Sequence, residues 1–206
     1  VVARFVALDE GGFQRQRLVL AADDDDVEVR HQADHGLRAR VLVGSPRVTA
    51  GFEAIRARVL GGERDLPKLR EEVSEMRAKM RDNLGTRETV AGTAANAFDT
   101  GQSFDLKQDA GGIVDIEFMV QYAVLAWSHR HPQLLRYTDN IRILDGLGEL
   151  DLLPLEDVSL LQDAYRALRA VAHRQALQKQ PGKVAADQLS AERGTVLRVW
   201  RELGLL

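Results

Sequence analysis

Residues 104–121 read FDLKQDAGGIVDIEFMVQ, a stretch that begins a central helix and places polar side chains inside it. The spacing predicts a helix from Gly112 to about Arg130, with glycines at its start and His131-Pro132 at its end. Two apolar surfaces cover almost its whole circumference, which indicates burial on more than one side. The first consists of Ile113, Ile116, Val120, Ala123, Val124 and Trp127, and the second of Phe118, Met119, Tyr122 and Leu125.

Three polar residues of this helix, Asp115, Glu117 and Gln121, therefore lie in or beside the core. Glu117 and Gln121 are one turn apart on the same edge. A buried carboxylate costs several kcal/mol, on the order expected for an unpaired buried charge, unless a positive group meets it. We therefore expect a basic partner surface for this helix.

A second predicted helix, at residues 155–178, offers such a surface. Arg166, Arg169 and His173 cluster on one of its sides, next to its apolar stripe. They can pair with the acidic residues of the central helix inside the bundle. Alternatively, they and Lys107 form a polar pocket for a phosphate, which the carboxylates help to organise. The sequence leaves both hypotheses open.

The start of the central helix also has two interpretations. Gly111 and Gly112 allow close backbone approach, and free N–H groups at a helix start favour an anion. Asp105 and Lys107 lie just outside, so a phosphate-binding site is one hypothesis. Two glycines alone are a weak motif and lack the glycine-lysine pattern of a P-loop. The alternative is a tight turn whose charges are satisfied internally.

The remaining sequence from Ser45 onward predicts further helices and no strand-type alternation. Ser45-Pro46 predicts the start of a helix that ends near Leu60. An amphipathic helix follows at residues 66–84, with an apolar stripe of Leu66, Leu69, Val73, Met76, Met80 and Leu84. Its charged residues are predicted to be solvated, namely Lys68, Arg70, Glu71, Glu72, Glu75, Arg77 and Lys79. Other helices are predicted at residues 138–147, 155–178 and 184–203. We expect a mainly all-α fold, a bundle of about five to seven helices.

Composition limits the classes of function. The net charge of −3 and the 5% aromatic content argue against a nucleic-acid partner. The absence of cysteine excludes disulfides and thiolate metal sites. No apolar run reaches membrane-spanning length, so we expect a cytoplasmic protein with no membrane partner. The chain begins without methionine and is expected to be a piece of a longer one.

Two segments have no helical periodicity. The acidic run at residues 23–26 is predicted to be a solvated loop, although its Asp-x-Asp spacing is also compatible with Mg²⁺. Residues 85–103 are rich in small and polar side chains and are predicted to form a long loop, which in a compact domain is commonly functional or disordered.

Several segments together resemble one enzyme family. The run FDLKQDAGGIVDIEFMVQY is similar to the hallmark segment of the bifunctional glutamine synthetase adenylyltransferases, which attach and remove AMP on a tyrosine of glutamine synthetase. Other segments agree in the same order: HQADHGLRARVLVGSP, FEAIRARVL, EEVSEMRAKM, TDNIRILDGLGELDLL and AYRALRAVAHRQALQ. The resemblance covers about residues 13–178 and is closer to the second, adenylylating half of the family.

The resemblance implies a domain organisation within a longer enzyme. Each half of a member is a nucleotidyltransferase domain followed by a helical domain. Residues 1–44 are then the end of the nucleotidyltransferase domain, and residues 45–206 are the helical bundle. The family's Gly-Ser and paired aspartates hold Mg²⁺ for attack on the ATP α-phosphate. Here Gly44-Ser45 opens a helix, so we expect no catalytic residue and no metal ligand in this chain. Mg²⁺ and ATP belong to the full-length enzyme, and the chain alone is predicted to be inactive.

The resemblance also implies where the site lies and which partners it serves. The helical domain covers the nucleotidyltransferase cleft and presents this segment to it, with Lys107 at a phosphate. The leading site residues are Asp105, Lys107, Gly111, Gly112, Asp115, Glu117 and Gln121. Weaker candidates are Asn140, Arg142, Arg166, Arg169 and His173. The implied partners are glutamine synthetase and a PII signalling protein, and a regulatory docking module is the alternative function.

Overall fold

The computed structural model describes residues 7–9, 12–14, 37–41, 44–86 and 103–205. The acidic run at residues 23–26, with its possible Mg²⁺ site, and nearly all of the predicted loop at 85–103 lie outside these residues. The chain forms two units: residues 1–64 with 123–146, and residues 65–122 with 147–206.

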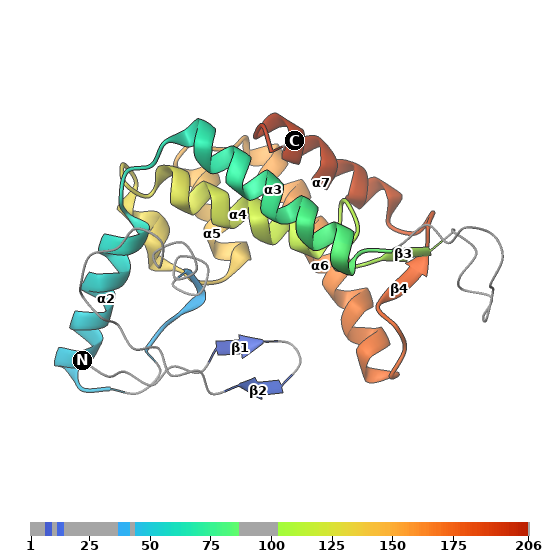
Figure 1. Ribbon diagram of the computed structural model, residues 1–206, viewed down its shortest axis with the longest axis horizontal. Coiled ribbons are helices and arrows are strands. Elements are labelled where there is room, and N and C mark those ends of the chain that lie inside the picture. The colour runs from blue at the N-terminus through green and yellow to red at the C-terminus, as the bar shows by residue number, and fades with distance from the viewer. Residues whose placement is uncertain (1–6, 10–11, 15–36, 42–43, 87–102, 206) are drawn as a thin grey trace. The chain divides into compact units, whose positions relative to one another are not determined.

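Helices dominate the described residues, which confirms the predicted all-α class (Figure 1). Six α-helices lie in the described residues, within the predicted number: α2 (Pro46–Leu60), α3 (Leu66–Leu84), α4 (Ile113–Trp127), α5 (Asn140–Glu149), α6 (Leu155–Leu177) and α7 (Ser190–Glu202). A 3-10 helix, η1 (Pro132–Arg136), precedes α5. In this part of the chain, four three-residue strands form two antiparallel pairs: β1 (Ala7–Asp9) with β2 (Gly12–Gln14), and β3 (Ser103–Asp105) with β4 (Lys183–Ala185).

The starts of α2 and α3 follow from their capping residues. Ser45 has an extended backbone, and its side chain accepts a hydrogen bond from the N–H of Val48 at 3.4 Å. Asp65 does the same for the N–H of Lys68 at 3.2 Å. A proline lies in the first turn of each helix, where its missing N–H costs nothing. Both observed helices have the bounds predicted from the sequence.

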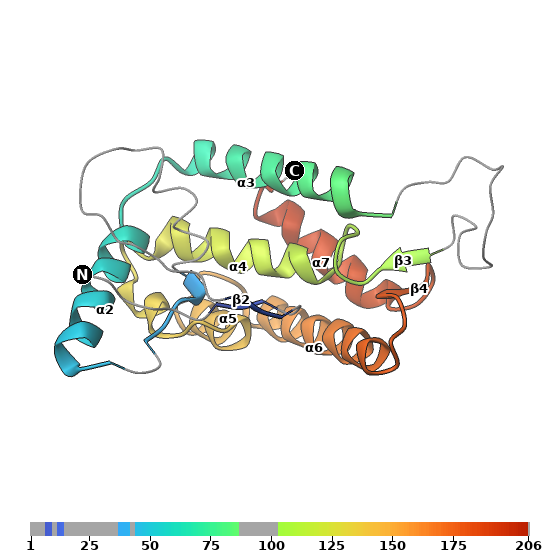
Figure 2. The ribbon, with the colours of Figure 1, turned by 60° about the horizontal axis from the view of Figure 1, so that its bottom comes forward.

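In the second unit, the first part of α4 lies alongside α3, α6 and α7 (Figure 2). The residues of α4 are buried almost throughout, and Tyr122 and Ile116 have no exposed surface. Arg70 of α3 donates a hydrogen bond of 2.9 Å to the Tyr122 hydroxyl. Arg198 of α7 pairs with Asp157 of α6, and this hydrogen bond raises the pKa of Arg198. The predicted central position of this helix is therefore observed within the unit.

The β3–β4 pair corrects two sequence predictions. Strand structure was not expected beyond Ser45, and the last helix was expected from residue 184 rather than from Ser190. Phe104 and Val184 face each other in the pair, and each is the one buried residue of its strand. Strands this short contain no full cycle of apolar alternation, so the sequence pattern could not indicate them.

The orientation of α3 also differs from the prediction. Leu69 of the expected apolar stripe is buried, but Met76 and Leu84 are exposed by 51% and 57%. Arg77, predicted to be solvated, has no exposed surface. The buried face of α3 therefore includes Arg77. Pairing of this arginine with the buried Asp115 outweighs the apolar pattern at this position.

In the first unit, the buried Arg56 and the half-buried Arg64 hold the ends of helices and turns. Arg56 of α2 donates to the carbonyl oxygens of Leu135 at 2.5 Å and Leu37 at 3.1 Å. Arg64 donates to carbonyls at the end of α2, including that of Val59 at 2.8 Å. Burial lowers the pKa of both guanidinium groups. These arginines satisfy carbonyl groups that a helix end leaves without partners.

Candidate functional site

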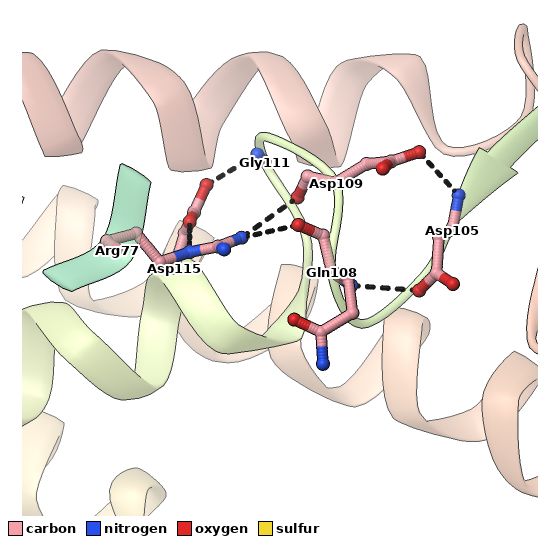
Figure 3. A network of polar contacts seen from close by, with 6 residues as sticks. All are labelled: Arg77, Asp105, Gln108, Asp109, Gly111 and Asp115. Carbon is pink, nitrogen blue, oxygen red and sulfur yellow. Dashed lines mark hydrogen bonds and ion pairs between the residues drawn. The ribbon is translucent and has the colours of Figure 1, made fainter. Parts of the chain in front are cut away.

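Residues 105–112, from the last residue of β3 to the residue before α4, form a loop held by its own side chains. We call it the Lys107 loop (Figure 3). The Asp105 carboxylate accepts hydrogen bonds from the N–H groups of Lys107 at 2.9 Å and Gln108 at 2.8 Å. The N–H of Asp105 donates to the Asp109 carboxylate at 2.7 Å. The two aspartates thus close the loop at its start, in the manner typical of aspartate in turns.

Asp109 is a structural residue of the site that sequence reasoning missed. Its other carboxylate oxygen accepts a hydrogen bond of 2.7 Å from the N–H of Thr86, just after α3. Asp109 therefore connects the end of α3 to the loop. The available signal was the recurrence of aspartate four residues after Asp105 in a segment rich in turn residues.

The N–H groups of residues 111–114, at the start of α4, all donate within the protein. In order, they donate to the Asp115 carboxylate (2.6 Å) and to the carbonyl oxygens of Asp109 (3.0 Å), Leu106 (2.9 Å) and Lys107 (3.2 Å). This geometry is that of the internally satisfied turn, the second of the two hypotheses for the helix start. A phosphate interaction at this loop then depends on side chains rather than on these N–H groups.

The two glycines are required by geometry. Gly111 has φ of +86°, a conformation that other residues rarely adopt, and a Cβ there would lie 3.0 Å from the carbonyl oxygen of Arg193. At Gly112 a Cβ would lie 2.9 Å from the carbonyl oxygens of Asp109 and Leu106. The glycines therefore allow the loop to fold back tightly against itself and α7.

Asp115 pairs with Arg77 of α3, which corrects the expectation of a partner on α6. Arg77 Nε lies 2.5 Å from Asp115 Oδ1, and the side chains are 0% and 2% exposed, respectively. Arg77 Nη2 also donates to the carbonyl oxygen of Gln108 at 2.7 Å. Breaking a buried pair of this kind typically costs about 3–5 kcal/mol, because the remaining charge is left without compensation. The charge that seemed costly in the sequence is thus compensated inside the unit.

Glu117 does meet α6, through a tyrosine. The Tyr165 hydroxyl donates to Glu117 Oε1 at 3.4 Å. Arg169 Nη1 donates to the same hydroxyl at 3.4 Å, and its guanidinium lies 5.6 Å from the centre of the Tyr165 ring. Glu117 is half-buried. The structure therefore places Arg169 on the Glu117 side of α6.

The other basic candidates on α6 are exposed. Arg166 pairs with Asp163 at 2.9 Å and with the side chain of Gln162 at 3.3 Å. His173 lies on the exposed surface of the same helix. Both are available to solvent rather than being used to neutralise Asp115.

Among the seven leading site candidates, Lys107 has an exposed side chain. Its N–H donates to Asp105, and its carbonyl oxygen accepts from the N–H of Val114, so the backbone is held on both sides. The other leading candidates are less accessible. Gly111, Gly112 and Asp115 are buried, and Asp105, Glu117 and Gln121 are half-buried. The loop thus presents one cationic side chain on a fixed backbone.

The weaker candidates Asn140 and Arg142 belong to the first unit. Asn140 is buried at the start of α5. Arg142 pairs with Asp139 at 2.6 Å, and its guanidinium lies 4.5 Å from the centre of the Tyr137 ring. These contacts organise the start of α5.

Two other kinds of feature are absent from the described residues. In that part of the chain, no cluster of three or more histidine, aspartate or glutamate side chains could hold a metal ion. Among the same residues, every helix is too short or too polar to cross a lipid bilayer.

Comparison with known proteins gives one consistent group of relatives. The chain is 66% identical over 169 residues to a bifunctional glutamine synthetase adenylyltransferase/adenylyl-removing enzyme of Pseudomonas putida. It is 68% identical over 169 residues to that of Pseudomonas syringae pv. tomato, and 61% identical over 195 residues to that of Pseudomonas aeruginosa. These matches cover 82%, 82% and 95% of this chain, respectively.

The chain spans only 17% to 19% of the length of these relatives. A family model described as GlnD PII-uridylyltransferase matches residues 74–205. That match begins in α3, just before Arg77, and includes the whole Lys107 loop and the helices from α4 to α7.

Proposed function

The chain belongs to the family of the bifunctional glutamine synthetase adenylyltransferase/adenylyl-removing enzyme, and on that premise we propose that it is the helical part of the adenylylating half. In this role it supports transfer of AMP from ATP to a tyrosine of glutamine synthetase. The domain division at residue 44 and a cytoplasmic location belong to the same proposal.

One observation carries the proposal: Lys107 has an exposed side chain on a backbone held at both its N–H and its carbonyl oxygen. A preorganised cation acts at a developing negative charge without reorganising during the reaction. In the proposed role the Lys107 ammonium group contacts an ATP phosphate and stabilises charge on it. Asp115 and Gly111 act indirectly, because they shape the loop that carries Lys107.

The Mg²⁺ ion that the family uses does not fit the described residues, which contain no suitable carboxylate cluster. The metal would supply Lewis acid chemistry from ligands elsewhere in the whole enzyme. We therefore assign to the described residues the positioning of a phosphate-contacting lysine and no metal-dependent step.

The family model supports a role in nucleotidyl transfer. It is named for a uridylyltransferase, whereas the relatives are named for an adenylyltransferase, and residues 74–205 match the first while also resembling the second. The named protein substrates differ, but both names describe transfer of a nucleotidyl group. A region common to both is better suited to that shared chemistry than to recognition of glutamine synthetase.

The alternative function is a regulatory interaction module that docks a PII protein or glutamine synthetase without touching the reaction centre. The name of the family model, which refers to PII, favours this alternative. Under it, Lys107 contacts a partner protein instead of a phosphate.

A pair of lysine substitutions in the full-length enzyme separates the two functions. We expect Lys107→Ala to lower kcat/KM for ATP at least about tenfold, as expected for loss of one electrostatic contact to the transition state. Lys79→Ala is the matched control, because the Lys79 side chain is 73% exposed and pairs with Glu75, one turn away on the same helix. If Lys107→Ala leaves AMP transfer intact but abolishes the response to PII or glutamine, the alternative is correct.

The isolated chain provides a second test. We expect no transfer of labelled AMP from ATP to glutamine synthetase when the chain is supplied with Mg²⁺, because the resemblance to the family implies that the metal ligands of the reaction lie elsewhere in the longer enzyme. Mg²⁺-dependent labelling of glutamine synthetase by this chain alone would contradict its proposed supporting role.

A further inference from the structure

Arg77 is a buried residue of α3 whose contacts converge on the Lys107 loop (Figure 3). Its Nη2 group donates to the carbonyl oxygens of Gln108 at 2.7 Å and Asp109 at 3.5 Å. Its Nε group donates to Asp115. The guanidinium group thus holds the carbonyl groups of the two residues that directly follow Lys107, and it also holds the first turn of α4 through Asp115.

The other end of the loop is held through the same ion pair. Asp115 Oδ1 accepts from Arg77, while Asp115 Oδ2 accepts from the N–H of Gly111 at 2.6 Å. Arg77 therefore fixes the loop directly at Gln108 and, through one carboxylate, at Gly111. Figure 3 shows the Arg77 and Asp115 side chains next to each other, facing the loop that carries Gln108 and Gly111.

A second connection from the same part of the chain reinforces this arrangement. The N–H of Thr86, just beyond the end of α3, donates to Asp109. The loop is thus anchored to α3 at one point along the helix and at its end.

A buried ion pair is weak support for stability, since well-packed apolar residues of similar volume often replace such pairs without loss. The contacts of Arg77 with the loop backbone suggest a different role. We propose that Arg77 is a positioning residue, which holds the Lys107 loop so that the Lys107 ammonium group meets the reacting phosphate. This inference rests on the proposed function of Lys107.

The substitution Arg77→Lys distinguishes positioning from charge compensation. Lysine keeps the positive charge beside Asp115, but its single ammonium group lacks the planar fork that reaches Asp115 and the Gln108 carbonyl together. In the full-length enzyme, we expect a normal melting profile and a fall of about tenfold or more in kcat/KM for ATP, since small misplacements of a reacting group have effects of this size. KM for glutamine synthetase should not change. Lys79→Ala again serves as the exposed control.

Combination with Lys107→Ala supplies a readout that a merely structural role would not affect. If Arg77 acts through Lys107, the double variant Arg77→Lys/Lys107→Ala transfers AMP no more slowly than Lys107→Ala alone. A folded Arg77→Lys enzyme with unchanged kcat/KM for ATP would overturn the proposal. Multiplication of the two defects in the double variant would also overturn it.

The possible failures can be told apart. If Lys107→Ala itself has no effect on AMP transfer, the proposed function fails. If Lys107→Ala is slow but Arg77→Lys is not, the function stands and only the positioning role fails.

Should Arg77→Lys not fold, the apolar double variant Arg77→Met/Asp115→Leu tests the positioning role instead. A folded but slow enzyme supports positioning, and a folded, fully active one overturns it. If neither variant folds, the role of Arg77 is structural and the proposal is wrong.

Discussion

Arg77 on α3 and Asp115 on α4 form an ion pair in which both side chains are almost completely buried. Because each compensates a charge that has no access to water, removing one partner leaves the other at full desolvation cost. We expect Asp115→Asn to lower the free energy of unfolding of this chain by about 3 kcal/mol. Urea denaturation followed by circular dichroism measures this change.

Asp163→Asn is the matched control for that substitution. Asp163 also pairs with an arginine, Arg166, but its side chain is 70% exposed. Exposed pairs contribute about 0–1 kcal/mol, so the control should shift the unfolding midpoint only slightly. Equal effects of the two substitutions would show that burial does not set the strength of the Arg77–Asp115 pair.

Two glycine substitutions test the geometry of the loop. Gly111→Ala should destabilise the chain by about 1–3 kcal/mol, because its positive φ and the nearby Arg193 backbone both disfavour a Cβ. Gly194→Ala lies inside α7 with open space around its Cβ position, and it should stabilise the chain by up to about 1 kcal/mol. Thermal unfolding of both variants beside the parent chain gives the sign of each effect. A neutral Gly111→Ala variant would contradict the observed turn.

Amide hydrogen exchange tests whether the Lys107 loop is held as described. The N–H groups of Lys107, Gly111 and Ile113 each donate to an acceptor within the protein. We expect peptides covering residues 105–113 to exchange slowly, with protection close to that of α4, because exchange requires these hydrogen bonds to open. Arg77→Lys should speed exchange in this segment more than in α6. Rapid exchange of the loop in the parent protein would contradict a fixed backbone.

Most of the helices could be predicted because their signals are local. Ser45 with Pro46 fixes the start of α2, and the apolar circumference of residues 113–127 marks α4 as central. The β3–β4 pair joins residues about 80 positions apart through strands of three residues, so it has no local signal.

The candidate site could be predicted only in part, because partner choice is a tertiary property. The sequence indicated that Asp115 needs a cation, but its periodicity placed Arg77 on the charged face of an amphipathic helix. Met76 is exposed while its neighbour Arg77 is buried. Electrostatic pairing, rather than the apolar stripe, therefore orients this part of α3. Asp109 was missed because its contacts, to Asp105 and Thr86, depend on the folded loop.

In the proposed function, Lys107 contacts a phosphate of ATP in the whole enzyme. An ATP analogue with a lysine-reactive aldehyde on its phosphate chain tests this contact directly, with labelled peptides identified by mass spectrometry. We predict that the full-length enzyme is labelled at Lys107 and that ATP with Mg²⁺ prevents this labelling. Labelling of the exposed Lys79 should not be reduced by ATP. Labelling of Lys107 at the same rate with and without ATP, or labelling confined to other lysines, would contradict it.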